Sequence, residues 1–372
     1  MPWCVRKCPY CDFNSHSAGD GAPTGRYVDA LLADLEREAA NAGDRPVESV
    51  FLGGGTPSLF APAEITRLLD AVRGHFELLP DAEITMEANP GTVECGAPAG
   101  YRDAGVNRLS IGAQSFDDAT LQQLGRIHSS ADIRRAVTDA RSAGFDNLNI
   151  DLMHGLPGQT VATARADLQA AAELCPTHLS WYQLTLEPNT VFYARPPKGL
   201  PDEETAWAIQ DAGAELLSSL GFEQYEVSAW ARKDRRCRHN LNYWLFGDYL
   251  AVGAGAHGKV SDSGGVARYR KPANPLQYML AMEQGVEAWT RERLSSDDLI
   301  FEFMLNALRL TGGFREADFV ARTGLPSKRL AVAMSEPVEK GLIERDENAI
   351  WCPTDLGRRF LNDLQAEFLR DS

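Results

Sequence analysis

The sequence predicts an α/β protein with a parallel sheet, open or closed into a barrel, followed by a smaller helical domain. Short apolar runs recur at intervals of roughly 25 to 35 residues, the size of a βα unit, and helical patterns lie between them. After about residue 290 the apolar runs give way to helices, which begin at Ser295-Ser296-Asp297. In such folds the chemistry collects on the loops at the carboxyl ends of the strands.

The expected strands are the five apolar runs 49–52, 83–86, 108–111, 148–152 and 179–184. Four of them lead straight into turns that contain Gly or Pro, and the fifth ends before Pro188. The four turns are Gly53-Gly54-Gly55, Asn89-Pro90-Gly91, Gly112 and Gly155-Leu156-Pro157-Gly158.

The expected helices carry their apolar residues on one face. The three clearest faces are Tyr27, Leu31, Leu32 and Leu35; then Ile65, Leu68, Leu69 and Val72; then Trp207, Leu216 and Leu217, in a segment that opens with Asp202-Glu203-Glu204. Near the C-terminus, one helix over about 327–340 and a small hairpin through Ala349-Ile350-Trp351 predict a winged-helix-like end. Residues 315–372 carry 9 Lys and Arg against 11 Asp and Glu, which favours a structural or docking role over DNA binding.

Composition excludes several classes of protein. The formal charge of −15 and the pI near 5.0 argue against a protein that binds nucleic acid by neutralising phosphates. No apolar run reaches about 18 residues, so no membrane span is expected, and no signal peptide precedes the first motif. These features predict a cytoplasmic protein.

A compact cysteine motif opens the chain. Cys4, Cys8 and Cys11 are spaced C-x3-C-x2-C, and the other four cysteines are scattered. Thiolates suit iron–sulfur clusters and zinc, but Asp12 and His16 fit no zinc-finger spacing as a fourth ligand. Three cysteines on one loop would hold three irons of a [4Fe–4S] cluster and leave the fourth iron open to a cofactor.

Several further motifs identify a family. Together with the cysteine loop, in which Tyr10 precedes the last Cys, they resemble the radical S-adenosylmethionine (SAM) enzymes, closest to the coproporphyrinogen-dehydrogenase-like branch and its HemW-type heme chaperones. The resemblance covers nearly the whole chain. The motifs are Pro2-Trp3-Cys4 through His16, Gly53-Gly54-Gly55-Thr56-Pro57-Ser58, Glu87-Ala88-Asn89-Pro90-Gly91, Gln114-Ser115-Phe116, Gly125-Arg126-Ile127-His128, Asp151-Leu152-Met153-His154-Gly155-Leu156-Pro157 and His239-Asn240-Leu241-Asn242-Tyr243-Trp244.

The resemblance implies a partial parallel (β/α)6 barrel over residues 1–230, a connecting segment over 231–290 and a C-terminal helical domain over 291–372. It also implies a [4Fe–4S] cluster on Cys4, Cys8 and Cys11. The SAM contacts it implies are Tyr10, Gly54, Gly55, Thr56, Glu87, Gln114, Arg126 and Asp151, with Thr185 a weaker candidate near the adenine. Without the family resemblance, the Gly triplet would be interpreted as a tight turn and Arg126 as a surface residue.

Two departures from the family matter. Coproporphyrinogen dehydrogenases carry a further Cys two residues after the motif, where this chain has Phe13, and a longer N-terminal segment. Both differences favour the chaperone branch. The family also has a first strand before the cysteine loop, where only Met1-Pro2-Trp3 stand here. The first strand of the barrel is therefore expected to be missing, through truncation or a misassigned start codon.

The heme candidates lie in the motif His239-Asn240-Leu241-Asn242-Tyr243-Trp244. Histidine is an axial ligand of heme iron, and in a helix Tyr243 would lie one turn from His239, where its ring can pack on a porphyrin. The plain alternative is a capped helix with core aromatics. Cys237 is a second ligand candidate, although such a cysteine is more often inert.

One apparent dinucleotide-binding motif is rejected. Residues 253–258 match G-x-G-x-x-G, but no helix pattern follows and residue 278 is Tyr rather than an acid, so no dinucleotide site is expected. A Gly-rich wall near the cofactor is the better interpretation.

The resulting hypothesis is a heme chaperone that binds heme and transfers it to acceptors such as respiratory enzymes, with an electron donor as a further partner. The alternatives are anaerobic decarboxylation of coproporphyrinogen III and a radical enzyme with another substrate. Peripheral membrane association and a homodimer stay open, and no catalytic residue is assigned.

Overall fold

A computed structural model describes residues 1–19, 21–91, 98–287 and 289–369. The core is a seven-stranded sheet in the order β3-β4-β5-β6-β7-β9-β8. The first five strands run parallel, and β9 and β8 join antiparallel at one edge. The strands are β3 (Val47–Leu52), β4 (Leu78–Ala88), β5 (Arg108–Gln114), β6 (Asn147–His154), β7 (His178–Gln183), β8 (Glu223–Glu226) and β9 (Ala229–Ala231).

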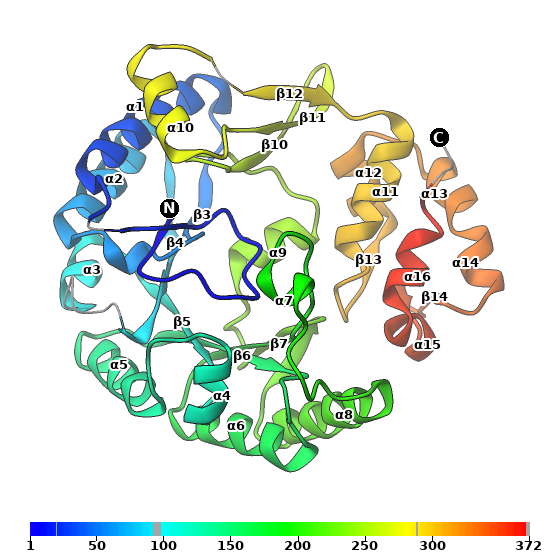
Figure 1. Ribbon diagram of the computed structural model, residues 1–372. Helices are drawn as coiled ribbons and strands as arrows, with labels where there is room; N and C mark the ends of the chain where they lie inside the picture. The colour runs from blue at the N-terminus through cyan, green and yellow to red at the C-terminus, as the bar shows by residue number, and fades with distance from the viewer. Residues whose placement is uncertain (20, 92–97, 288, 370–372) are drawn as a thin grey trace.

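All five expected strands are confirmed, and helices follow them around the outside of the curved sheet (Figure 1). The helices are α1 (Thr24–Ala42), α2 (Pro62–His75), α3 (Pro98–Ala104), α4 (Asp118–Gln123), α5 (Ser130–Ser142), α6 (Val161–Glu173), α7 (Val191–Ala194) and α8 (Glu203–Ser219), with a 3-10 turn over Pro57–Leu59. Alternate residues of β6 show why the sheet has two faces. Leu148, Ile150 and Leu152 are buried in the main hydrophobic core, while Asn149 and Asp151 bond polar groups of neighbouring strands.

The N-terminal residues lie outside this sheet. β1 (Trp3–Cys4) pairs in parallel with β2 (His16–Ser17), so the two ends of the cysteine loop lie side by side. In the described part of the chain, five strands of the main sheet run parallel, as in a partial barrel. None of the described helices is both long and apolar enough to cross a lipid bilayer.

The described residues of 238–287 and 289–293 form a bridge across the open side of the curved sheet (Figure 1). It contains α9 (Arg238–Trp244), β10 (His257–Asp262), β11 (Gly265–Arg270), α10 (Pro275–Glu283) and β12 (Thr290–Arg293). β10, β11 and β12 form a small antiparallel sheet, and α10 lies beside α1 (Figure 1). A strand, β10, follows Gly253-Ala254-Gly255-Ala256, which confirms the rejection of a dinucleotide fingerprint.

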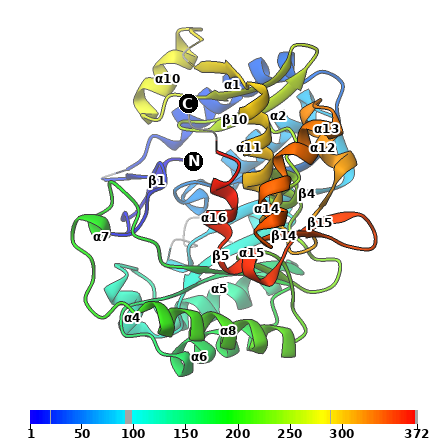
Figure 2. The same ribbon diagram turned by 90° about the vertical axis from the view of Figure 1, so that its right-hand side faces the viewer.

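The C-terminal helices pack around their own apolar core, in front of the sheet in Figure 2. The elements are α11 (Ser296–Ala307), β13 (Phe314–Arg315), α12 (Glu316–Thr323), α13 (Ser327–Ala333), α14 (Ser335–Glu339), β14 (Ile343–Arg345), β15 (Ile350–Pro353), α15 (Asp355–Arg359) and α16 (Leu361–Ala366). The β14–β15 hairpin follows the helices as expected. The single helix expected over 327–340 was wrong, because it is broken into α13 and α14. The division into three domains stays a prediction.

Candidate functional site

The cysteine loop, residues 3–17, is fixed at both ends. The amide of His16 donates to the Pro2 carbonyl (2.7 Å), and the Ala18 amide donates to Cys4 O (2.9 Å). Between them, the Asn14 side chain donates to the carbonyls of Ala254 (3.0 Å) and Ala273 (2.8 Å). The Gly-rich segment therefore supports the loop that carries the three thiols.

The three thiols are half-exposed, and polar groups surround each of them. The hydroxyl of Thr56 donates to Cys4 Sγ (3.3 Å), Arg126 Nη1 donates to Cys8 Sγ (3.6 Å), and Cys11 Sγ lies 3.7 Å from Ser15 Oγ. Donors directed at sulfur stabilise the charge of an iron–sulfur cluster. Three accessible thiols on one loop with such donors fit a [4Fe–4S] cluster.

The glycine triplet lies directly beneath the first residues of the chain. A Cβ on Gly54 would lie 2.9 Å from Met1 O, and one on Gly55 would lie 2.6 Å from Trp3 O. Gly54 also has a φ of +114° and donates its amide to Glu87 Oε2 (3.0 Å). A side chain at either position would push the backbone away, so the triplet is more than a tight turn.

Two carboxylates, Glu87 near the end of β4 and Asp151 within β6, form the acidic side of the site. Burial and the charge of Asp151 raise the pKa of Glu87 to about 7. Burial also raises the pKa of Asp151, although the Ser110 hydroxyl (3.0 Å) and the Asn149 amide (2.7 Å) donate to it and partly offset that rise. Two neighbouring carboxyls that resist ionisation together favour a cationic ligand between them.

Arg126 and Gln114 are positioned by their neighbours. Arg126 Nη2 donates to Asn89 Oδ1 (2.5 Å) and to the Gly112 carbonyl (2.8 Å). Gln114 ends β5 with a φ of +73° and accepts a bond from the Tyr182 hydroxyl (2.7 Å). Backbone strain in a non-Gly residue at a strand end is typical of functional positions.

The structure brings most of the predicted cofactor residues together. Tyr10 interacts electrostatically with Cys8 and Arg126, and Thr56 joins Cys4 to Asn89 through the bond from Asn89 Nδ2 (2.9 Å). Thr185 is exposed just after β7 and makes none of these contacts. Phe13 is 59% exposed on the cysteine loop.

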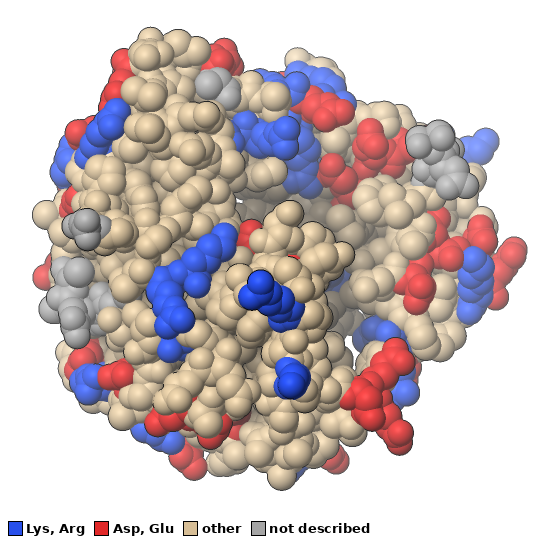
Figure 3. Space-filling model, in the orientation of Figure 1, with Lys and Arg blue, Asp and Glu red and all other residues tan. Residues whose placement is uncertain are grey.

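Two basic side chains lie on the surface of the cysteine loop. Arg6 and Lys7 on the cysteine loop are exposed. Lys and Arg gather on this part of the face in Figure 3, although the chain as a whole is acidic. The loop therefore carries local positive charge.

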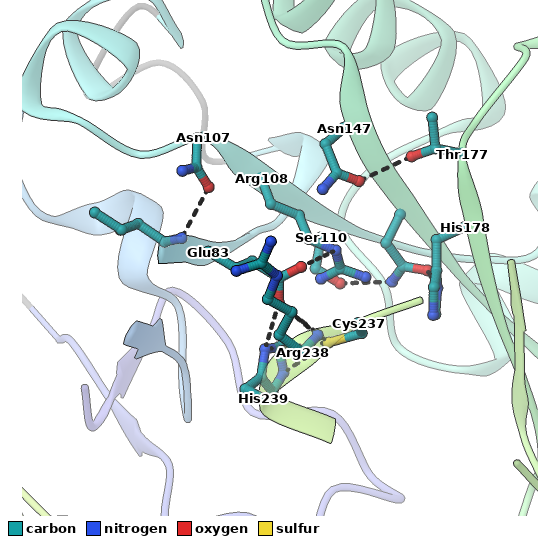
Figure 4. Close-up of polar contacts among 12 residues, drawn as sticks. Glu83, Asn107, Arg108, Ser110, Asn147, Thr177, His178, Cys237, Arg238 and His239 are labelled. Atoms are coloured by element: carbon teal, nitrogen blue, oxygen red, sulfur yellow. Dashed lines mark hydrogen bonds and ion pairs between the residues drawn. The ribbon is translucent and has the colours of Figure 1, made fainter. Parts of the chain in front are cut away.

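The predicted heme residue His239 lies in the first turn of α9 and is 8% exposed. Its ring stacks on Phe51 of β3 with centroids 4.3 Å apart, and Nδ1 lies 3.4 Å from Glu83 Oε1 and 3.1 Å from Cys237 Sγ (Figure 4). Burial works against a charge on Glu83, but His239 and Arg108 outweigh it and hold the pKa of Glu83 below its usual value. Burial lowers the pKa of His239, so the imidazole is neutral and can ligate a metal.

The other two predicted heme residues line a cleft. The ring of Tyr243 lies edge-on to His239 with centroids 6.4 Å apart, one helical turn away as expected. Tyr243 and Trp244 line a cleft of about 310 Å³ with Phe246, Gly247, Tyr249, His257, Lys259, Arg268 and Asn306. Four aromatic side chains suit a flat ligand, whereas Lys259 and Arg268 already pair with Asp248 and Glu302. His239 is not among the residues that line this cleft.

A network of polar side chains inside the sheet joins the two regions. Asn149 donates to Ser110 (2.7 Å) and to Asp151, and it lies 2.6 Å from His178 Nδ1; His178 Nε2 in turn lies 2.8 Å from the Tyr225 hydroxyl. The Cys237 amide donates to that hydroxyl (3.4 Å). The cofactor end of the barrel is therefore connected to the start of α9.

Sequence reasoning did not assign Glu83, Asn89 and Tyr182 to the site. Asn89 directly follows β4 and lies in a quoted motif, so its place could have been noted. Tyr182 lies on the same face of β7 as His178 and Ser180. The sequence interpretation did not use this alternation of every second residue. Glu83 gave no signal, because Cys237 and Arg238, its partners at the start of α9, lie more than 150 residues away.

Comparisons with known proteins agree with this geometry. The radical SAM superfamily pattern matches residues 1–171, and that of the HemN C-terminal domain matches residues 294–360. The chain is 46% identical to the heme chaperone HemW of Escherichia coli (strain K12) over 372 residues, covering 100% of this chain and 97% of that one. It is 32% identical to the heme chaperone HemW of Bacillus subtilis (strain 168), covering 99% and 97%. The solved structure of coproporphyrinogen III oxidase (HemN) from Escherichia coli matches with a TM-score of 0.82 at 24% identity, covering 99% of this chain and 88% of that chain, which shows a shared fold.

Proposed function

The chain belongs to the HemW family of the radical SAM superfamily, and from that premise we propose that it binds heme and transfers it to acceptor proteins. The observation that carries the proposal is the match along the whole length to chains named heme chaperones. Within the fold, α9 supplies a neutral imidazole, with two aromatic side chains at the edge of a cleft.

The family implies a [4Fe–4S] cluster and SAM. Cys4, Cys8 and Cys11 would hold the cluster, and Thr56 and Arg126 would donate to its ligands. A reduced cluster of this kind supplies an electron that cleaves SAM. For SAM itself, Glu87 and Asp151 would accept from the amine or ribose, and Tyr10, Gly54, Gly55, Gln114 and Arg126 would line the rest.

For heme, His239 would be the axial ligand, and Tyr243 and Trp244 would pack against the porphyrin. His239 Nδ1 is held by Glu83 and Cys237, so ligation of iron through that atom replaces those contacts. Arg268 lines the cleft and would bind a heme propionate in exchange for its present partner Glu302.

The alternative, decarboxylation of coproporphyrinogen III, is not favoured. Phe13 stands where that branch carries a further Cys, and the identity to the solved coproporphyrinogen III oxidase is about half that to the HemW chain of the same organism. Turnover of coproporphyrinogen III by the reconstituted protein with a reductant would reverse this ranking.

A hemin titration of the anaerobically reconstituted protein, followed through the Soret band, tests the proposal. We expect saturation near one heme per chain, and at least tenfold weaker binding in His239→Ala. The same substitution at the exposed His75 at the end of α2 is the matched control and should leave binding unchanged. Equal binding by the parent and His239→Ala would remove His239 as the ligand, and the lack of saturable binding would contradict the function.

The partners follow from the same proposal. Respiratory enzymes and other heme proteins are the acceptors, and the basic cysteine loop suits an electron donor with an acidic face. We place the protein in the cytoplasm. Transfer is measured by mixing the heme-loaded chain with an apo-acceptor and following recovery of the acceptor's activity.

A further inference from the structure

Glu83, Cys237 and His239 bring three different metal-ligating atoms together away from the cysteine loop. Glu83 comes from the middle of β4, and Cys237 and His239 flank the start of α9 (Figure 4). Glu83 is 6% exposed, Cys237 is fully buried and His239 is 8% exposed. Among the described residues, this is a group whose ligand atoms lie within 4.8 Å of one another.

The distances within this triad match the edges of a tetrahedral ion site. Bond lengths of about 2.3 Å to sulfur and about 2.1 Å to nitrogen and oxygen place tetrahedral ligands roughly 3.4 to 3.6 Å apart. The observed distances are 3.1 Å from Sγ to Nδ1, 3.6 Å from Sγ to Glu83 Oε1 and 3.4 Å from Nδ1 to Glu83 Oε1. Sγ also lies 3.5 Å from Nε2, over the face of the imidazole, so the ring has to turn for its Nδ1 lone pair to face an ion at the centre of the three atoms.

The charges around the triad also balance for a divalent ion. A Cys237 thiolate and the Glu83 carboxylate supply two negative charges. The buried Arg108 guanidinium adds a positive charge, and its Nε lies 3.9 Å from Glu83 Oε2. This Nε has no hydrogen-bond partner in the described part of the chain. Asp151 lies near enough to interact with Arg108 and offsets it when ionised.

The ligand set selects the kind of metal. A thiolate and an imidazole favour Zn²⁺ and its neighbours over Mg²⁺ and Ca²⁺, which take oxygen ligands. The amide of Arg238 donates to Glu83 Oε1 (3.0 Å) and orients the carboxylate from outside the triad.

We propose that Glu83, Cys237 and His239 bind one divalent first-row transition-metal ion such as Zn²⁺, at a site separate from the cysteine loop. The Cys237 thiol gives up its proton to solvent when the ion binds. The ion holds α9 against β4 and occupies His239 Nδ1, so it competes with any other ligand of that imidazole. The site itself does not depend on the proposed heme function, and only the competition does.

Cobalt is the probe, because a thiolate bound to Co²⁺ gives a charge-transfer band and tetrahedral Co²⁺ absorbs in the visible. The titration uses the full chain with Cys4, Cys8 and Cys11 changed to Ser, which removes the other cluster of thiols. We expect one Co²⁺ per chain with both signals, displaced by Zn²⁺. A chain that folds as the parent does by circular dichroism but shows no charge-transfer band would overturn the proposal.

Two further variants, with one control, identify the ligands on that background. Cys237→Ser should lose the charge-transfer band, and Cys352→Ser, which removes a half-exposed thiol of β15, should keep it. Glu83→Gln should weaken Co²⁺ binding at least tenfold. A band that survives Cys237→Ser contradicts the assignment.

The competition is tested last, with hemin added to chains with and without Zn²⁺. We expect Zn²⁺ to weaken hemin binding at least fivefold in the parent and not in Cys237→Ser. If Co²⁺ binds as described and hemin never does, the proposed function fails while the ion site stands.

Discussion

At the scale of single residues, Glu87 should give cofactor binding its pH dependence. Burial, then the charge of Asp151, raise its pKa to about 7. In the proposed SAM site, the ionised carboxylate would attract the amine, and the protonated one would not. SAM affinity should therefore rise with pH between 6 and 7.5, by up to roughly tenfold for one linked proton. Calorimetric titrations at several pH values measure this rise.

Two variants separate Glu87 from other titrating groups. Glu87→Gln should bind SAM more weakly and with a flat profile over this range. Asp151→Asn removes the neighbouring charge, so the midpoint should move to lower pH. An unchanged midpoint in both variants would show that another group is responsible.

How much of the site could be predicted depends on sequence distance. The three cysteines lie within eight residues, so their spacing alone indicated a metal site. For Glu87, Gln114 and Asp151 the pattern showed only polar residues near expected strand ends, and the family resemblance supplied their assignment to the cofactor. The burial of His239 against Glu83 could not be foreseen. It results from tertiary packing of α9 inside the sheet, which no local pattern records.

At the scale of elements, the strands were predictable because each apolar run stops at a turn residue. The break between α13 and α14 has a local cause that the spacing of apolar residues does not reveal. The ring of Pro337 clashes with the carbonyl four residues earlier, at Ala333, where α13 ends. Apolar spacing alone suggested one continuous helix.

The junction between α11 and β8 depends on a buried ion pair. Arg309 Nη2 lies 3.0 Å from Glu226 Oε2, and the guanidinium also covers the Trp244 ring at 4.4 Å. The Glu226 side chain is 4% exposed, so Arg309→Met leaves a buried carboxylate without its partner. We expect a loss of about 3 kcal/mol in the free energy of unfolding, measured by urea denaturation.

The control for this junction is the exposed pair between Arg359 and Asp211, whose side chains are 60% and 63% exposed at 3.4 Å. Arg359→Met should cost at most about 1 kcal/mol. Glu226→Gln combined with Arg309→Met should recover part of the loss. Equal costs for the two arginines would contradict the role of burial.

At the scale of the whole molecule, residues 253–278 complete the structure by joining α1 across the open side of the sheet. Asp34 on α1 accepts from the Gly253 amide (3.1 Å) and the Tyr278 hydroxyl (2.7 Å). Glu38 on α1 accepts from the Tyr269 hydroxyl (2.6 Å). The sequence predicted the βα units on one side of this contact, but not the contact, because its partners are over 200 residues apart.

Lys271 is the centre of that contact. Its ammonium lies 2.6 Å from Asp34 Oδ1, 2.5 Å from Glu38 Oε1 and 3.7 Å from the centre of the Trp289 ring, and its side chain is fully buried. Lys271→Met leaves two buried carboxylates facing each other, so we expect unfolding to become easier by about 3 to 5 kcal/mol in urea. Arg26→Met is the matched control, since Arg26 of α1 pairs with Glu283 of α10 nearby but with side chains 43% and 44% exposed, and it should cost at most about 1 kcal/mol. The same segment supports Asn14 of the cysteine loop, so iron per chain after reconstitution should also fall in Lys271→Met and not in Arg26→Met. Similar stability and iron content in the two variants would show that the contact does not hold the molecule closed.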